Sequence, residues 1–358
     1  MKKIVFTIDV NSSGGAERVT SLLANYFNQH SYDVTVINSD VDSSFYPLDK
    51  GVKVVKMGLD YNTGTSYKRF LYKYRFLRNY FRKEKPDAVV TFLFHMEAPT
   101  ILAALSTRTH VFTSVRNSAF SYSKGVRTFR KIFYPLIAGV VFQSDKVMEF
   151  ADFKKIKHKR VIMNPLSLEM GNKKIVDYQD RKHWIINVGR LNGQKNQKLL
   201  IDAFAIICDK YPEYTLHIYG SGNLEAELET YIEEQKLIGR VILEGEILNA
   251  ISLHRDAYTF ALSSDFEGFP NALAEAMANG IPSVSTDFDS GVAAQLIKNG
   301  ENGYLCPVGE KMEMAKQLDK ILALPQNDYM QMANKAQKTC DELDINIIGQ
   351  QWESFCFE

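Results

Sequence analysis

Two carboxylates in the second half of the chain, Glu267 and Glu275, are separated by seven residues. The apolar run 257–262 predicts a buried strand, followed by a polar turn and an Ala-rich helix over about 271–277. Strand, turn and helix in this order aim backbone N–H groups into a crevice at the end of the strand. An ionised carboxylate accepts hydrogen bonds from two neighbouring hydroxyls at once, so we expect a hydroxyl-rich ligand here. A plain surface loop with solvated glutamates is the alternative interpretation.

A basic loop follows another predicted strand, residues 183–188. Arg190 supplies a forked pair of donors and Lys195 a compact point charge, a combination that suits a diphosphate. As isolated basic residues after a strand, the two would instead be solvated surface.

Two glycine turns also follow predicted strands. Gly14 and Gly15 come directly after the first strand and open a helix, where a close backbone approach and the helix N-terminus favour an anion. Gly220 and Gly222 begin like a dinucleotide fingerprint, but Glu225 occupies the third glycine position. This mismatch, together with the lack of a Walker A sequence, argues against an NAD enzyme and a P-loop kinase.

Polar residues end two predicted strands of the first half. His95 comes just after the strand 88–93, and it fits either a structural role or a contact with donor or acceptor. Arg116 and Asn117 end the strand 110–115, and we interpret Arg116 as a phosphate or acceptor contact.

Short apolar runs alternate with helical patterns in both halves, which predicts βαβ units and mostly parallel sheets. We therefore predict an α/β protein with two Rossmann-like domains, residues 1–165 and 166–344, facing each other across a cleft at the carboxyl ends of their strands. The predicted strands are 3–10, 33–38, 52–57, 88–93, 110–115, 139–143, 183–188, 214–219, 241–243, 257–262 and 283–285. Helices in the first half are predicted near 16–30, 67–85, 99–106 and 145–153.

Charge is divided unevenly between the halves, although the net charge is only +1. Residues 1–165 hold 26 Lys and Arg against 13 Asp and Glu, whereas residues 166–358 hold 17 against 29. The densest basic segment, Tyr67–Lys85, interleaves eight basic residues with aromatic ones. Such a segment suits an anionic membrane surface or a pyrophosphate-bearing lipid, with a solvated helix face as the alternative. Nothing in it reads bases, so we expect no nucleic-acid partner.

Compartment signals are few. No run reaches about 18 uncharged apolar residues, and Asp9 interrupts the N-terminal apolar run too early for a signal peptide. The cysteines 208, 306, 340 and 356 lack disulfide or metal-ligand spacing. We expect a cytoplasmic protein that binds peripherally to the cytoplasmic face of the membrane.

The stretch Ser264–Val284, SDFEGFPNALAEAMANGIPSV, resembles the Glu-seven-Glu signature of retaining glycosyltransferases of GT-B fold, of the bacterial family 4-like type that assembles polysaccharides or lipid-linked glycans. The resemblance implies that Glu267 binds the hydroxyls of the donor sugar and Glu275 the nucleotide ribose. It extends the donor site over the residues between them, Gly268, Phe269, Pro270, Asn271 and Ala272.

The same resemblance assigns roles to the other motifs. Arg190 and Lys195 would neutralise the departing nucleoside diphosphate, and the first glycine loop, in Gly-Gly-Ala-Glu-Arg-Val, would lie over the donor phosphates. The last helix, about 345–358, would cross back to the first domain. The chain departs from the family near Arg116, where many relatives carry a His that contacts the sugar. The remaining nucleotide contacts implied by the family are Gly220, Gly222 and Ile247.

The resemblance thus implies retaining transfer of a hexose or N-acetylhexosamine from a UDP-sugar to a glycan or lipid-linked glycan acceptor. No cofactor or metal is expected, because Arg190 and Lys195 offset the charge that Mg²⁺ would carry. Retention by same-face attack and by double displacement both stay open. The alternatives are a nonhydrolysing UDP-sugar epimerase, a dehydrogenase, and a noncatalytic glycan- or lipid-binding module.

Overall fold

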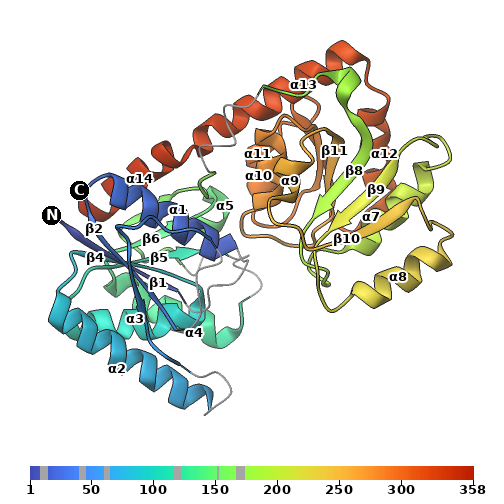
Figure 1. The fold of residues 1–358 in the computed structure, drawn as a ribbon. Coiled ribbons are helices and arrows are strands. Elements are labelled where there is room, and N and C mark those ends of the chain that lie inside the picture. The colour runs from blue at the N-terminus through green and yellow to red at the C-terminus, as the bar shows by residue number, and fades with distance from the viewer. Residues whose placement is uncertain (9–14, 40–45, 60–64, 117–121, 151–152, 167–173) are drawn as a thin grey trace. The chain divides into compact units, whose positions relative to one another are not determined.

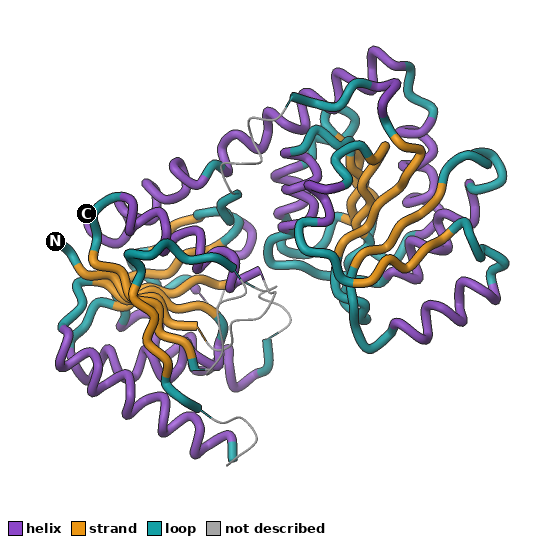
Figure 2. Tube along the Cα trace, viewed as in Figure 1, coloured by secondary structure: helices purple, strands orange, loops and turns teal. Residues whose placement is uncertain are grey.

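The computed structural model describes residues 1–8, 15–39, 46–59, 65–116, 122–150, 153–166 and 174–358. The chain divides into two compact units, the first made of Met1–Pro165 and Ile345–Glu358 and the second of Leu166–Asp344. Each unit is a sheet flanked by helices (Figure 1), and the strands of each sheet run side by side (Figure 2). The α/β, Rossmann-like class predicted from the alternating pattern is confirmed.

The first unit is built on a parallel sheet whose described strands, seven in number, run in the order β3-β2-β1-β4-β5-β6-β7. The order reverses around β1 and β4, and sheets of this kind bind ligands at the carboxyl ends of the strands beside such a reversal. The strands are β1 (Lys3–Ile8), β2 (Asp33–Asn38), β3 (Lys53–Lys56), β4 (Ala88–Phe92), β5 (Val111–Val115), β6 (Gly139–Phe142) and β7 (Lys159–Val161).

Helices cover both faces of this sheet because alternate residues of a strand point to opposite sides. On β1, Phe6 packs with helices α1 and α14, whereas Val5 packs with α2 and α3. The helices are α1 (Gly15–Gln29), α2 (Ser66–Glu84), α3 (Phe94–Thr107), α4 (Lys124–Phe133), α5 (Asp145–Met148) and α14 (Ile345–Phe357), with the 3-10 turn η1 (Tyr134–Leu136).

Two helix boundaries differ from the sequence-based prediction by more than one residue. Helix α3 begins at Phe94 rather than at Pro99, because Pro99 is accepted inside the helix at the loss of one backbone hydrogen bond. Helix α5 ends at Met148, earlier than the predicted residue 153.

The second unit repeats the plan with six described parallel strands in the order β10-β9-β8-β11-β12-β13. These are β8 (Lys182–Val188), β9 (Thr215–Tyr219), β10 (Val241–Gly245), β11 (Ala257–Leu262), β12 (Ser283–Thr286) and β13 (Gly303–Cys306). The helices are α7 (Gln197–Ile207), α8 (Glu225–Glu234), α9 (Ala250–Leu253), α10 (Asn271–Ala278), α11 (Val292–Leu296), α12 (Lys311–Leu322) and α13 (Gln326–Thr339), with η3 (Tyr178–Asp180) and η4 (Cys340–Leu343).

Helix α14 belongs to the first unit although it follows the whole of the second unit in sequence. Trp352 is fully buried and meets Phe92 edge-on, with ring centroids 6.1 Å apart. The carboxylate of Glu353 accepts hydrogen bonds from the hydroxyls of Tyr26 at 3.3 Å and Tyr32 at 2.6 Å. Burial and this carboxylate raise the pKa of Tyr26 to about 12. These contacts tie α14 to α1 and its neighbours.

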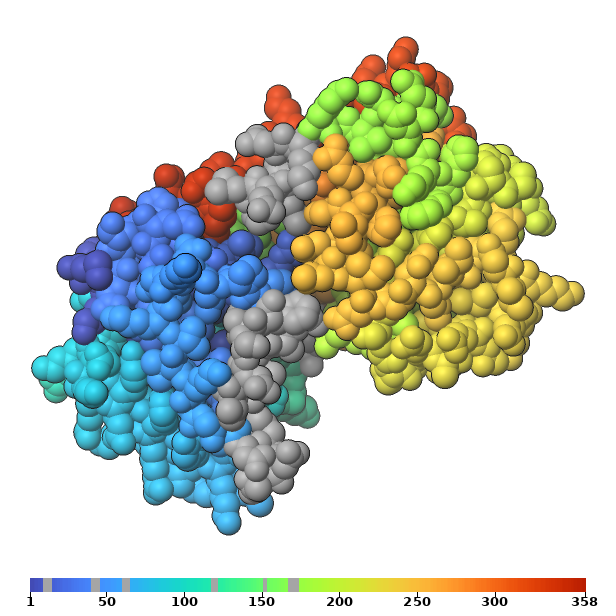
Figure 3. Space-filling view, in the orientation of Figure 1, coloured from blue at the N-terminus to red at the C-terminus, as the bar shows by residue number. Residues whose placement is uncertain are grey.

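Helix α2 is amphipathic and lies at the surface of its unit, among the blue-to-cyan residues at the lower left of Figure 3. Leu77 and Phe81 are buried in the core, whereas Arg75, Arg82 and Lys85 are exposed. Along the described parts of the chain, no helix combines the length and apolar character needed to span a bilayer.

Candidate functional site

Glu267 lies in the turn between β11 and α10. Strand β11 is buried along its whole length and pairs with β8 on one side and β12 on the other, so the turn emerges near the middle of the sheet. The Glu267 side chain is only 8% exposed. A carboxylate so enclosed needs several hydrogen-bond donors to compensate for the loss of water.

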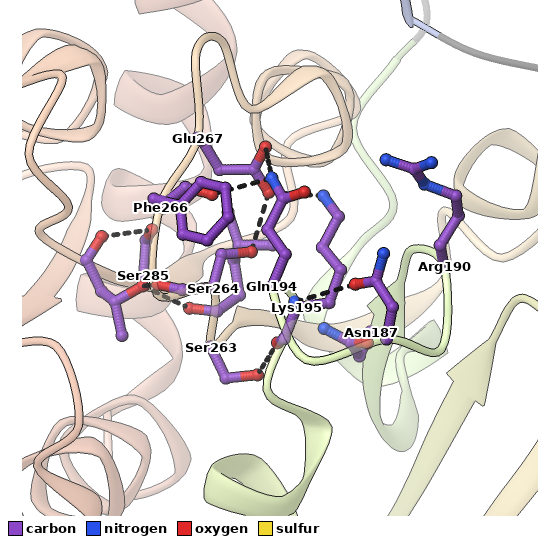
Figure 4. Close-up of polar contacts among 12 residues, drawn as sticks. Asn187, Arg190, Gln194, Lys195, Ser263, Ser264, Phe266, Glu267 and Ser285 are labelled. Carbon is purple, nitrogen blue, oxygen red and sulfur yellow. Dashed lines mark hydrogen bonds and ion pairs between the residues drawn. The ribbon is translucent and has the colours of Figure 1, made fainter. Parts of the chain in front are cut away.

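Three side chains supply those donors (Figure 4). The Lys195 Nζ lies 2.5 Å from Oε1 of Glu267, and the Ser264 hydroxyl donates to the same oxygen at 2.8 Å. The Gln194 amide donates to Oε2 at 3.4 Å and to the Phe266 carbonyl at 2.9 Å. The protein therefore fixes the orientation of Glu267 and leaves most of the free acceptor capacity on Oε2.

The loop after β8 and the turn after β11 are fastened to each other by further hydrogen bonds. The Ser263 hydroxyl donates to the Lys195 carbonyl at 2.9 Å, and the Asp265 N–H donates to the Gln194 carbonyl at 2.9 Å. The Asn196 amide donates to Asp265 at 2.8 Å. Since β8 and β11 are neighbours in the sheet, their carboxyl-terminal loops meet here and bring Lys195 to Glu267.

Arg190 lies in the same loop but is exposed, and in Figure 4 no interaction joins its guanidinium to the Lys195–Glu267 pair. It forms no ion pair with any side chain in the described ranges. Its backbone carbonyl accepts a hydrogen bond from the Gln197 amide at 3.0 Å. The backbone of Arg190 is therefore held while its cationic side chain stays available to a ligand.

Gly220 and Gly222 pack directly on this loop. A Cβ on Gly220, whose φ is +145°, would lie 2.0 Å from the Gly189 carbonyl oxygen, and one on Gly222 would lie 2.2 Å from the Leu191 carbonyl oxygen. The two glycines are thus required where the turn after β9 meets the loop that carries Arg190. Their contact with a nucleotide stays a prediction.

The other predicted donor-site residues lie in the same unit as Glu267. Glu275, in the second turn of α10, is buried. Ile247, after β10, is 38% exposed. The turn residues Gly268, Phe269 and Pro270 are buried, and Asn271 and Ala272, partly exposed, begin α10.

The predicted residues of the first half gather at a different place, within the first unit. His95 and Arg116 line one cavity of about 290 Å³ at the carboxyl ends of β4 and β5. Gly15 is exposed at the start of α1, whereas Gly14 and Asn117 lie outside the described residues. The cavity, called the β4–β5 cavity below, is lined by Leu93, Phe94, His95, Ser114, Arg116, Tyr122, Val126 and Arg130.

Arg116 is a buried cation. Its Nη1 donates to the Asn164 side-chain oxygen at 2.6 Å, and its guanidinium lies 4.2 Å from the centre of the Phe92 ring. Burial lowers the pKa of Arg116, and the attraction of Glu17 only partly opposes this effect.

Sequence reasoning missed the residues that hold Glu267, namely Ser264 and Gln194, and the other polar residues of the β4–β5 cavity, Ser114 and Arg130. Ser264, Gln194 and Ser114 each lie within three residues of a predicted site residue, which is a local signal, whereas Arg130 lies near none of them in sequence. Across the described segments, no three His, Cys, Asp or Glu side chains are grouped as ligands of a metal ion would be.

Comparison with known proteins covers most of the chain. A family model described as Glycosyltransferase Family 4 matches residues 13–168, and one described as Glycosyl transferases group 1 matches residues 172–339. The Campylobacter jejuni protein named GalNAc-alpha-(1->4)-GalNAc-alpha-(1->3)-diNAcBac-PP-undecaprenol alpha-1,4-N-acetyl-D-galactosaminyltransferase is 28% identical over 98% of this chain and 97% of its own length. The amylovoran biosynthesis glycosyltransferase AmsD of Erwinia amylovora is 26% identical over 91% of this chain and 92% of its own.

Solved structures share the fold. The crystal structure of HepE from Anabaena in complex with UDP matches with a TM-score of 0.78 at 18% identity, over 99% of both chains. The lipopolysaccharide outer core galactosyltransferase WaaB matches with a TM-score of 0.75 at 22% identity, over 100% of this chain and 99% of the other.

Proposed function

The chain belongs to the glycosyltransferases of GT-B fold and family 4-like type, and we propose that it transfers a hexose or N-acetylhexosamine, with retention of configuration, from a UDP-sugar to a glycan or lipid-linked glycan acceptor. The observation that carries the proposal is the enclosed Glu267 carboxylate beside Lys195, with the exposed cation Arg190 in the same loop.

In this proposal the second unit binds the donor. Arg190 and Lys195 hold the pyrophosphate, because an ammonium has three N–H donors and Lys195 uses one of them on Glu267. Oε2 of Glu267 accepts hydrogen bonds from the sugar hydroxyls. Glu275 binds the ribose, while the backbone near Ile247 contacts the base.

We propose same-face attack as the route to retention. The leaving phosphate oxygen accepts the proton of the acceptor hydroxyl as the new glycosidic bond forms on the face from which UDP departs. A carboxylate that already accepts hydrogen bonds from Lys195, Ser264 and Gln194 is a weak nucleophile, which argues against a covalent intermediate on Glu267. Arg190 and Lys195 supply the positive charge that a divalent metal would otherwise bring to the leaving group.

The first unit serves the acceptor in this proposal, with His95 and Arg116 as contacts. The exposed cations Arg75 and Arg82 of α2, together with Lys85 at its C-cap, suit an anionic bilayer or a lipid diphosphate. The named acceptor of the Campylobacter jejuni relative is itself a PP-undecaprenol glycan. We therefore place the enzyme peripherally on the cytoplasmic face of the membrane.

The test is release of UDP from a panel of UDP-hexoses and UDP-N-acetylhexosamines, with a lipid extract as the source of acceptor. We expect one donor to release UDP in an acceptor-dependent manner and Glu267→Gln to lower the rate by about 10²-fold or more. Glu313→Gln is the matched control, because Glu313 is partly exposed on α12 and its carboxylate contacts Lys316 and Gln317 of the same helix. Conversion of a UDP-sugar to its epimer without acceptor would instead support the epimerase.

A further inference from the structure

The β4–β5 cavity contains polar groups whose hydrogen bonds the protein leaves unmade. Ser114, Arg116 and Arg130 are 1%, 9% and 2% exposed, so solvent reaches none of them freely. The Ser114 Oγ, the Arg116 Nε and the Arg130 Nη1 have no hydrogen-bond partner in the described structure. A buried polar group left without a partner destabilises a protein by about 1–3 kcal/mol, so three in the wall of one cavity call for an explanation.

The two guanidiniums differ in how their charge is balanced. Arg130 forms a bidentate pair with Glu97, at 3.1 and 2.8 Å, and Tyr134 donates to the same carboxylate at 2.9 Å. Arg116 bonds to a neutral amide oxygen, and among the described carboxylates none forms an ion pair with it. Within the described residues, the cavity wall therefore carries an excess positive charge that no carboxylate neutralises at contact distance.

The backbone around the cavity has two further features of a ligand site. Leu93 lines the cavity with a φ of +60° and ψ of 132°, a conformation that costs a non-glycine residue about 1–3 kcal/mol and that occurs most often at functional sites. Helix α3 begins at the next residue, Phe94. Its first two residues, Phe94 and His95, line the cavity, so the positive end of the helix dipole lies at the cavity wall.

We propose that the β4–β5 cavity binds an anionic group, a carboxylate or a phosphoryl group, whose oxygens accept hydrogen bonds from Ser114, Arg116 and Arg130. The inference rests on the proposed function in one respect, namely that the bound anion is part of the acceptor of glycosyl transfer. Binding of the anion by the isolated protein does not depend on glycosyl transfer.

The volume and the lining of the β4–β5 cavity restrict the class of ligand further. The volume of about 290 Å³ lies just below the range of about 300–1,000 Å³ found for ligand pockets. Such a cavity takes one sugar unit or one headgroup rather than a lipid chain. Apart from the polar groups, its wall is apolar and aromatic, with Phe94 and Tyr122. The acceptor we infer is therefore a sugar acid or a phosphorylated sugar, with its ring against these side chains.

The test is calorimetric titration of the whole protein with inorganic phosphate, D-glucuronate and neutral D-glucose at constant ionic strength. We expect phosphate or glucuronate to bind and glucose to bind far more weakly. Binding of phosphate alone, or of glucuronate alone, supports the site and identifies the anion it prefers. Absence of binding by both anions overturns the proposal.

Ser114→Ala is the decisive variant, because it removes an unpartnered hydroxyl. We expect it to leave the melting temperature unchanged or raise it, yet to weaken anion binding about tenfold. Thr91→Val is the matched control, since Thr91 lies on the neighbouring strand with an equally unpartnered, buried Oγ1 that does not line the cavity. It should leave anion binding unchanged.

Arg190→Ala separates the two cationic sites. Anion binding that survives Arg190→Ala and falls in Ser114→Ala supports the proposal, whether or not any donor is turned over. Binding that disappears in Arg190→Ala and is unaffected by Ser114→Ala would locate the anion in the second unit and refute it. Arg116→Lys, which keeps the charge but loses the fork, should weaken binding of either anion if the variant folds.

Discussion

Arg190 and Lys195 lie in one loop, but the structure predicts different consequences for their removal. Lys195→Ala takes away the shortest contact of an enclosed carboxylate, so we expect the free energy of unfolding of the protein to fall by about 1–3 kcal/mol. Arg190→Ala removes an exposed side chain without an ion pair in the described structure, so stability should be unchanged. Both variants should lower donor turnover by about 10²–10³-fold.

Denaturant unfolding and UDP release measure these two effects separately. Lys198→Ala is the control, because Lys198 is partly exposed and its ion pair with Glu227 lies on the surface. A Lys195→Ala protein as stable as the wild type would show that Glu267 does not depend on this lysine.

At the residue scale, the sequence predicts the site residues that belong to a motif. It does not predict the residues that only the fold brings to the site. Glu267 and Lys195, 72 positions apart, were both selected, and the structure places them in contact. Ser114 and Arg130 carry no motif, and they share a cavity only because β5 and α4 end beside it. Such a cluster depends on tertiary packing, which no local pattern reports.

At the scale of elements, the turn after β9 packs against the loop after β8 and fixes the position of that loop. Gly220→Ala would place a Cβ 2.0 Å from the Gly189 carbonyl oxygen, at a φ that a side chain rarely adopts. We expect a loss of at least about 1–3 kcal/mol in unfolding free energy together with weaker UDP binding, because the loop must shift and take Arg190 with it. Gly193→Ala, in the same loop but with open space around its Cβ position, should leave the melting temperature nearly unchanged.

Helix α2 is the element that the membrane proposal depends on. Replacing Arg75, Arg82 and Lys85 together by Ala should weaken cosedimentation with anionic vesicles, most clearly at low salt. These positions are chosen because they are exposed, whereas Arg78 of the same helix is only partly exposed and contributes to packing. Replacement of Lys210, Lys311 and Lys316, exposed cations of the second unit, is the control. Equal vesicle binding by both triple variants would argue against a membrane role for α2.

Element prediction succeeded where apolar runs were long. Strands β2 and β11 were predicted with the bounds that the structure shows, because β11 is a nearly continuous apolar run and β2 has a centre of β-branched residues, 34–37. Strands β7 and β13 were missed. The first is three residues long and begins with two basic residues, and the second is four residues long and begins with a glycine. Short edge strands are defined by the neighbour they pair with rather than by their own composition.

At the scale of the whole molecule, α14 completes the core of the first unit. Trp352→Ala should destabilise that unit by about 3–5 kcal/mol, because it empties the space of a fully buried indole. Hydrogen exchange resolved by peptide should show faster exchange in residues 1–165 and no change in residues 166–344. Trp184→Phe, at a partly exposed position of the second unit, is the control. Faster exchange spread evenly over both units would contradict a role confined to the first.

The discontinuous first unit also constrains the order in which the protein acquires its structure during translation. Residues 345–358 leave the ribosome only after all of residues 166–344. While the second unit is being synthesised, the core of the amino-terminal sheet therefore lacks the indole of Trp352. A chain that ends at residue 344 and is released from the ribosome should therefore have a folded second unit and a protease-sensitive first one. Expression of residues 1–165 alone calls for residues 345–358 to be supplied as a fused or added peptide.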